Sequence, residues 1–125
     1  MQDFKDLKVW DKAHHLTIKV YRATGGFPRA EEFGLRSQLR RASVSIPSNI
    51  AEGCGRGSQK EFAQSLQVAI GSANEVEYQL LLACDLGYLP KQSRHELDME
   101  LAEVRMMLAR LVERDRSSSR SPRKA

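Results

Sequence analysis

The sequence is poor in cysteine, in aromatic residues and in long hydrophobic runs. Its two cysteines, Cys54 and Cys84, form no CxxC pair, so reduced and packed thiols are expected in place of a disulfide framework. Aromatic residues make up 6% of the chain. Few exposed rings are therefore expected, which argues against recognition of nucleic acid by stacking on its bases.

No apolar run approaches the roughly 20 residues that a membrane-spanning helix needs. The opening segment, MQDFKDLKVW, lacks the apolar stretch of a signal peptide. We therefore expect a cytoplasmic protein with no membrane partner. Its 125 residues fit one domain, which is long enough to bury a core without disulfides or a metal.

A recognisable catalytic constellation is also missing. No Ser-His-Asp or Cys-His arrangement can be assembled, and Asp11 and His15, one helical turn apart, supply two metal ligands at most. The segment GCGRGS at residues 53–58 has the glycines of a phosphate-binding loop, but neither its lysine nor a preceding strand. We therefore expect no enzymatic activity, no metal site and no cofactor.

The sequence does contain the hydrophobic periodicity of helices. No segment alternates strictly between apolar and polar residues, as a half-buried strand does. Apolar residues instead recur every three or four positions, most clearly at Leu97, Leu101, Val104, Leu108 and Leu111 and at Phe62, Leu66, Ala69, Ala73, Val76 and Leu80. The chain is therefore expected to be all-α.

Start and stop signals divide the chain into four helices. They are expected at about residues 6–24, from 29–31 to the turn at 53–57, at 58–86 and at 92–114. The clearest start is the capping box of Ser58 and Glu61. Gly87 and Pro90 then end the third helix, because glycine suits the left-handed position after a helix and proline cannot extend it.

Short turns between the helices predict their arrangement. Sequential helices joined in this way are antiparallel, so residues 1–114 are expected to form an up-and-down four-helix bundle. Residues 115–125, DRSSSRSPRKA, contain no apolar residue except the last alanine. We expect a disordered basic tail there.

Pro47 falls inside the second helix. The apolar stripe of Leu35, Leu39, Ala42, Ile46 and Ile50 keeps its phase through the proline, which favours one kinked helix over two separate helices. Proline removes the hydrogen bond to the carbonyl of Ser43, at a typical cost of about 3 kcal/mol. The hydroxyls of Ser43, Ser45 and Ser48 are expected to serve the displaced backbone groups.

The first helix has two apolar faces. Leu7, Trp10, His14, Ile18 and Tyr21 share one, and Val9, Ala13, Leu16 and Val20 lie nearly opposite. One face can fill the core, and the other needs a partner, for which a second copy of the chain is the simplest candidate. We assign this oligomer interface to Val9, Ala13, Leu16, Val20, Phe33, Val44 and Ala51.

Positive charge is concentrated on the first helix. Lys5, Lys8, Lys12, His15, Lys19 and Arg22 follow a three-four spacing along one side of it. The fourth helix carries Glu96, Asp98, Glu100 and Glu103 on its outer surface, so positive and negative charge are expected to lie apart. Such a row either forms a solvated face or binds successive phosphates of RNA or DNA.

Three arginines, Arg36, Arg40 and Arg41, add to the cations near the start of the second helix. Arg36 and Arg40 flank its core stripe, and Glu75 and Glu77 on the third helix are candidate ion-pair partners within or between subunits. The alternative is that these arginines bind an anionic ligand. Our candidate nucleic-acid-binding residues are Lys8, Lys12, His15, Lys19, Arg22, Arg36, Arg40 and Arg41.

Three longer motifs carry a family resemblance: FKDLKVWDKA, GLRSQLRRASVSIPSNIAEGCGRGSQKEF and AIGSANEVEYQLLLACDLGYL. From about Phe4 to Leu111, the chain resembles the bacterial four-helix bundle family first described as proteins encoded in intervening sequences of 23S ribosomal RNA genes. The resemblance implies a bundle that assembles as a homo-oligomeric ring, typically a pentamer, with no known enzymatic activity. The positions that fall in the family pattern are Arg40, Arg41, Pro47, Asn49, Glu52, Gly53, Gly71, Ser72 and Glu75.

Related accessory proteins of diversity-generating retroelements are similar, and they bind nucleic acid and a reverse transcriptase through a basic surface. Two hypotheses for this chain follow. The first is an oligomer that binds structured RNA or DNA, as an accessory of a nucleoprotein complex. The second is a structural or protein-interaction ring that binds no nucleic acid.

Overall fold

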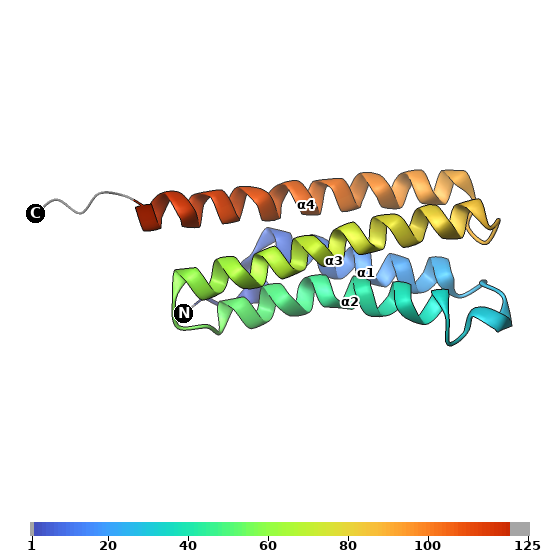
Figure 1. The fold of residues 1–125 in the computed structure, drawn as a ribbon, viewed down its shortest axis with the longest axis horizontal. Coiled ribbons are helices and arrows are strands. Elements are labelled where there is room, and N and C mark those ends of the chain that lie inside the picture. The colour runs from blue at the N-terminus through green and yellow to red at the C-terminus, as the bar shows by residue number, and fades with distance from the viewer. Residues whose placement is uncertain (1, 121–125) are drawn as a thin grey trace, which may run out of the picture.

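The structure, a computed structural model, describes residues 2–120 and confirms the all-α fold. Its long helices are α1 (Lys8–Thr24), α2 (Leu35–Cys54), α3 (Gln59–Asp85) and α4 (Lys91–Arg120), and short 3₁₀ helices lie at Phe4–Asp6 and Arg29–Glu31. No strand occurs among the described residues. The four helices alternate in direction along a common axis, and α4 extends past the others at its C-terminal end (Figure 1).

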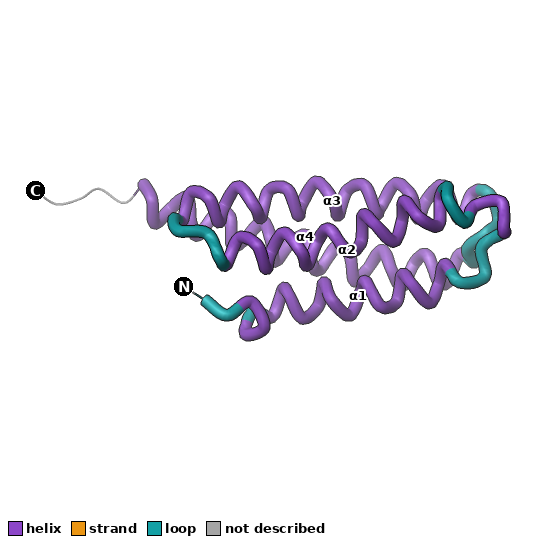
Figure 2. Tube along the Cα trace, turned by 90° about the horizontal axis from the view of Figure 1, so that it is seen from below, coloured by secondary structure: helices purple, strands orange, loops and turns teal. Residues whose placement is uncertain are grey.

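Each helix packs against two neighbours. Helix α1 contacts α2 and α4, and α3 contacts the same two helices from the other side. Figure 2 shows the loops between α1 and α2 and between α3 and α4 gathered at one end of the bundle. One hydrophobic core contains residues of all four helices, including Leu16, Leu39, Leu80 and Leu108.

The predicted start and end of α3 are confirmed. The hydroxyl of Ser58 accepts a hydrogen bond from the amide of Glu61, at 3.2 Å. This bond satisfies one of the amides that have no partner in the first turn of a helix. Gly87 has a φ of 80°, the left-handed conformation that only glycine adopts at little cost.

Helix α2 begins later than the sequence predicts. Residues Arg29–Glu31 form a separate 3₁₀ turn, and the α-helix starts at Leu35. The side chain of Glu31 folds over this start, where Oε1 accepts from the amide of Leu35 at 2.9 Å and Oε2 accepts from the Tyr88 hydroxyl at 3.2 Å. Tyr88 follows α3, so this cap depends on a residue that is distant in the sequence.

Helix α4 continues to Arg120, so the predicted end at Arg114 is too early. Serine and arginine do not stop a helix, because each added residue gains a backbone hydrogen bond once the helix exists. Residues 121–125 of the predicted tail lie outside the described residues.

The inward face of α1 is the reverse of our assignment. Val9, Ala13, Leu16 and Val20 are buried in the chain's own core, so they are not available to a second copy and the interface assigned to them is wrong. These four side chains are small or branched aliphatics that fit among three other helices. Tryptophan, histidine and tyrosine carry polar atoms that need partners when buried, and they lie on the other face.

Pro47 lies inside α2, which is one continuous helix. The two-helix alternative is therefore excluded, while the kink stays a prediction. The hydroxyl of Thr17 on α1 lies 3.0 Å from the carbonyl oxygen of Ser43, the group that Pro47 leaves without its usual donor. Two of the three serines that we expected to serve displaced backbone groups bond elsewhere, since Ser43 donates to the Arg40 carbonyl and Ser45 bonds to Ser72. The role of Ser48 stays a prediction.

Candidate functional site

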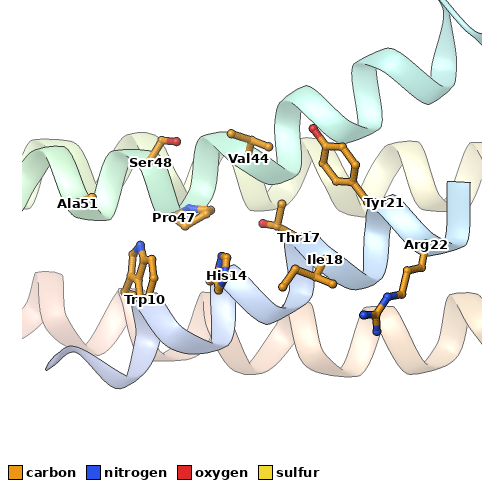
Figure 3. Close-up of a pocket in the computed structure, with 10 residues that line it drawn as sticks. All are labelled: Trp10, His14, Thr17, Ile18, Tyr21, Arg22, Val44, Pro47, Ser48 and Ala51. Carbon is orange, nitrogen blue, oxygen red and sulfur yellow. The ribbon is translucent and has the colours of Figure 1, made fainter. Parts of the chain in front are cut away.

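A groove of about 580 Å³ lies on the outer side of α1 and α2. Trp10, His14, Ile18 and Tyr21 line it from α1, and Val44, Pro47, Ser48 and Ala51 line it from α2 (Figure 3). These α1 residues form the outer apolar face of the helix, of which Trp10 also packs against the edge of the core. We call this feature the α1–α2 groove.

Contacts within the chain hold the aromatic side chains of the groove in place. The ring of Trp10 stacks on that of His14, with centroids 5.0 Å apart and planes 6° apart. Phe4 also contacts the Trp10 ring, in an edge-on arrangement with centroids 4.9 Å apart. A ring fixed in this way loses little conformational freedom when a partner binds. The Trp10 end of the groove is therefore preorganised.

Arg40 contacts Tyr21, one of the residues that line the groove. Its guanidinium carbon lies 4.6 Å from the centre of the Tyr21 ring, within the range of a cation–π contact. The same side chain donates to the Thr24 hydroxyl at 2.9 Å and to the Tyr21 carbonyl at 3.0 Å. Arg40 thus connects α2 to the last turn of α1. The Tyr21 side chain is still 42% exposed.

The expected ion pairs between α2 and α3 do not form within the chain. Arg36 approaches Glu32 at 3.4 Å, and Arg40 uses only α1 partners. Glu77 instead accepts from Arg105 of α4, at 2.8 Å. The reason is that Glu77 lies on the edge of α3 that faces α4. The sequence places it beside the apolar stripe but does not say which neighbour lies there.

The basic row on α1 does not stand apart from the acidic surface of α4. Lys12 pairs with Glu103, and Lys19 pairs with Glu100 at 2.6 Å. Glu103 raises the pKa of Lys12, through a hydrogen bond and its charge. The expected separation of charge is therefore wrong, because the antiparallel packing of α1 on α4 sets these side chains opposite one another.

His15 is also engaged locally. Its Nδ1 lies 2.8 Å from the carbonyl oxygen of Asp11 and 3.5 Å from the Asp11 carboxylate. Among the described residues, Lys8, Arg22 and Arg41 form no ion pair. These three remain the exposed cations of our candidate set that are not opposed by a carboxylate.

A second cationic feature escaped the sequence analysis. Lys8, Arg110 and Arg114 surround a hollow of about 240 Å³ between the start of α1 and the last part of α4, over Leu7, Val9, Met107 and Leu111. Among the described residues, no carboxylate lines it. The i, i+4 spacing of Arg110 and Arg114 on an antiparallel neighbour of α1 is the signal that would have identified it. We call this feature the basic hollow.

The remaining predicted interface residues lie at the surface. Phe33 is 89% exposed and Val44 is 38% exposed, and Val44 and Ala51 line the α1–α2 groove. Their role in an interface stays a prediction.

Three further observations concern metal ligands, thiols and membrane spans in the part of the chain that the structure describes. It contains no group of three or more His, Cys, Asp or Glu side chains placed to hold a metal. Burial raises the pKa of the Cys54 thiol, which disfavours the reactive thiolate. None of its helices combines the length and the apolar character needed to cross a membrane.

Comparison with known proteins identifies the family. The family model described as 23S rRNA-intervening sequence protein matches residues 5–110. The chain belongs to this family. A solved structure of a family-related protein, described as a protein of unknown function from the S23 ribosomal protein family of Bacteroides thetaiotaomicron, has a TM-score of 0.75. It is 25% identical to this chain, and the match covers 83% of this chain and 97% of that one.

The search of curated proteins returned no match. The match to the family model confirms the family resemblance that the sequence motifs indicate. The similar solved structure is itself described as a protein of unknown function.

Proposed function

We propose that this family member is a non-enzymatic interaction scaffold that associates with copies of itself through the α1–α2 groove and closes into a ring. The observation that carries the proposal is the groove itself, an apolar and aromatic surface that no segment among residues 2–120 covers. Extended exposed apolar surface of this kind marks interaction sites on soluble proteins. Tryptophan, tyrosine and arginine, which meet here, are the residues most enriched where binding energy concentrates.

The mass of the protein in solution tests this proposal. We expect light scattering at micromolar concentration to return a multiple of the 14.1 kDa chain mass. Ile18→Arg and Val44→Arg place a charge in the groove without entering the core, to which neither residue belongs. Both variants should therefore shift the protein to monomers while leaving its helix content unchanged. A wild-type protein that is monomeric at this concentration refutes the proposal.

Val68→Arg is the matched control. Val68 is an exposed valine on α3, outside the groove. The Val68→Arg variant should therefore have the same mass in solution as the wild type. Equal loss of association in Val68→Arg and Val44→Arg would mean that the groove has no special role.

Binding of a nucleic-acid backbone is the second candidate function, and the basic hollow favours it. Lys8, Arg110 and Arg114 line the hollow, and none of its described lining residues is a carboxylate, whereas Lys12 and Lys19 face Glu103 and Glu100. A carboxylate repels an approaching phosphate, so unopposed cations contribute more to backbone binding. We therefore propose the basic hollow as the surface by which the protein serves a nucleoprotein complex.

Fluorescence anisotropy with a structured RNA and with duplex DNA tests this second function. Near 50 mM salt, R110Q/R114Q should weaken binding and reduce the salt slope by about 2, since each neutralised phosphate contact contributes roughly 0.9. R29Q/K91Q makes the same charge change in the 3₁₀ turn before α2 and at the first residue of α4, away from the hollow, and should have a smaller effect. The absence of wild-type binding at that salt concentration would exclude this function.

A further inference from the structure

Phe33 is the most exposed large hydrophobic side chain of the described residues, at 89%. It lies between the 3₁₀ turn Arg29–Glu31 and the start of α2. The turn that carries it is anchored, because Glu31 binds both the Leu35 amide and the Tyr88 hydroxyl. Phe33 is thus an exposed apolar side chain on an anchored turn at one end of the bundle.

The α1–α2 groove has the size and the lining to accept such a projection. Its volume of about 580 Å³ falls in the range of sites that enclose whole small ligands, so it can take a phenyl ring together with neighbouring side chains. Ile18, Val44, Pro47 and Ala51 offer apolar contacts along it. Phe33 is almost fully exposed, so it does not occupy the groove of its own chain.

The charges beside the two features are complementary. Phe33 directly follows Glu31 and Glu32, and Glu32 is an exposed carboxylate whose contact with Arg36 is long, at 3.4 Å. Arg40 lies beside Tyr21 of the groove, and Arg22 lines the groove without an ion pair in the described chain. An acidic segment that carries an aromatic ring therefore matches an apolar groove with arginines beside it.

We infer that Phe33 of one copy inserts into the α1–α2 groove of a second copy of this chain. This inference rests on the self-association proposed above and names the segment that occupies the groove. Because the projection and the groove are different surfaces, each copy gives one contact and receives another. Such heterologous contacts build a ring when the rotation closes, and a filament when it does not.

Mixing two variants that do not associate on their own tests the inference. Phe33→Ala keeps the groove, and Val44→Arg keeps the projection, so each variant alone should be monomeric, with Kd raised roughly tenfold or more. An equimolar mixture has one intact projection and one intact groove, and light scattering should return a dimer that contains one copy of each. If the mixture remains monomeric, the heterologous contact is refuted.

The outcomes separate this inference from the proposed function. If Phe33→Ala keeps the wild-type mass, the inference is overturned, while association through the groove stands. If the wild type is monomeric, both fail. Circular dichroism checks that Phe33→Ala is folded, which is expected because the side chain makes almost no contact with its own bundle.

A photo-crosslinking residue gives a second, independent measurement. In the otherwise wild-type chain, Phe33 is replaced by p-benzoylphenylalanine, which retains an aromatic ring. Irradiation should join it to α1 or α2 peptides of a second copy, between Trp10 and Arg22 or between Val44 and Ala51. Crosslinks to α3 or α4, or none between copies, would overturn the inference.

Discussion

The hydrogen bond between Thr17 and Ser43 is expected to compensate for Pro47. The Thr17 hydroxyl lies 2.9 Å from the Ala13 carbonyl oxygen and 3.0 Å from that of Ser43. Thr17 is 9% exposed and Ser43 is 0% exposed, so water does not readily replace a lost donor. Thr17→Val keeps the shape of the side chain and removes the hydroxyl. It should lower the free energy of unfolding by about 1–3 kcal/mol, the typical cost of a buried polar group without a partner.

Pro47→Ala tests whether the Thr17 hydroxyl replaces the backbone amide that proline lacks. Alanine restores the backbone amide that normally binds the Ser43 carbonyl, so the Thr17 hydroxyl becomes redundant for that oxygen. Thr17→Val should then cost at least about 1 kcal/mol less in the Pro47→Ala background than in the wild type. The sign of the Pro47→Ala effect does not matter, because the cycle measures only the coupling between the two sites.

Urea unfolding of the four proteins measures this coupling. All four should carry Val44→Arg, because Pro47 lines the α1–α2 groove and association would otherwise change the apparent stability. Thr17→Ser retains the hydroxyl and serves as the control for the bond itself. If Thr17→Val costs the same in both backgrounds, the proposed compensation is wrong.

Two further predictions concern packing and thiol reactivity. A Cβ at Gly53 would lie 2.8 Å from the Ser65 Cβ and 3.0 Å from the Phe62 ring, whereas one at Gly71 meets nothing within 4 Å. In urea unfolding, Gly53→Ala should therefore destabilise the bundle by about 1–3 kcal/mol, and Gly71→Ala should stabilise it by about 0.5–1 kcal/mol. Equal effects of the two substitutions would contradict the close approach of α2 and α3. Cys54 is 7% exposed, and burial raises the pKa of its thiol. Iodoacetamide at mildly alkaline pH should therefore alkylate the partly exposed Cys84 first. Mass spectrometry of the peptides gives the order in which the two cysteines react, and faster labelling of Cys54 would contradict this prediction.

The number and order of the helices could be predicted because their signals are local. The cap of α3 joins Ser58 to Glu61, and Gly87 follows the helix that it ends. The continuous α2 could also be inferred, since the apolar stripe keeps its phase through Pro47. Each of these features depends on residues within about one or two turns of one another, and that information is present in the sequence.

The candidate site depended on contacts between distant residues. Periodicity defines two apolar faces on α1, but not the rotation of the helix about its own axis, so Val9, Ala13, Leu16 and Val20 were assigned to the wrong surface. The pairing of Lys19 with Glu100 joins residues on α1 and α4, and the start of α2 depends on Tyr88.

The sequence by itself therefore determined an all-α chain of four capped helices with the motifs of its family. Only the tertiary structure decided that Trp10, His14, Ile18 and Tyr21 lie in an open groove, and that carboxylates of α4 oppose Lys12 and Lys19. The physical reason is that helix formation is governed by neighbours in the chain, whereas the face that each helix presents is set by packing against the other three.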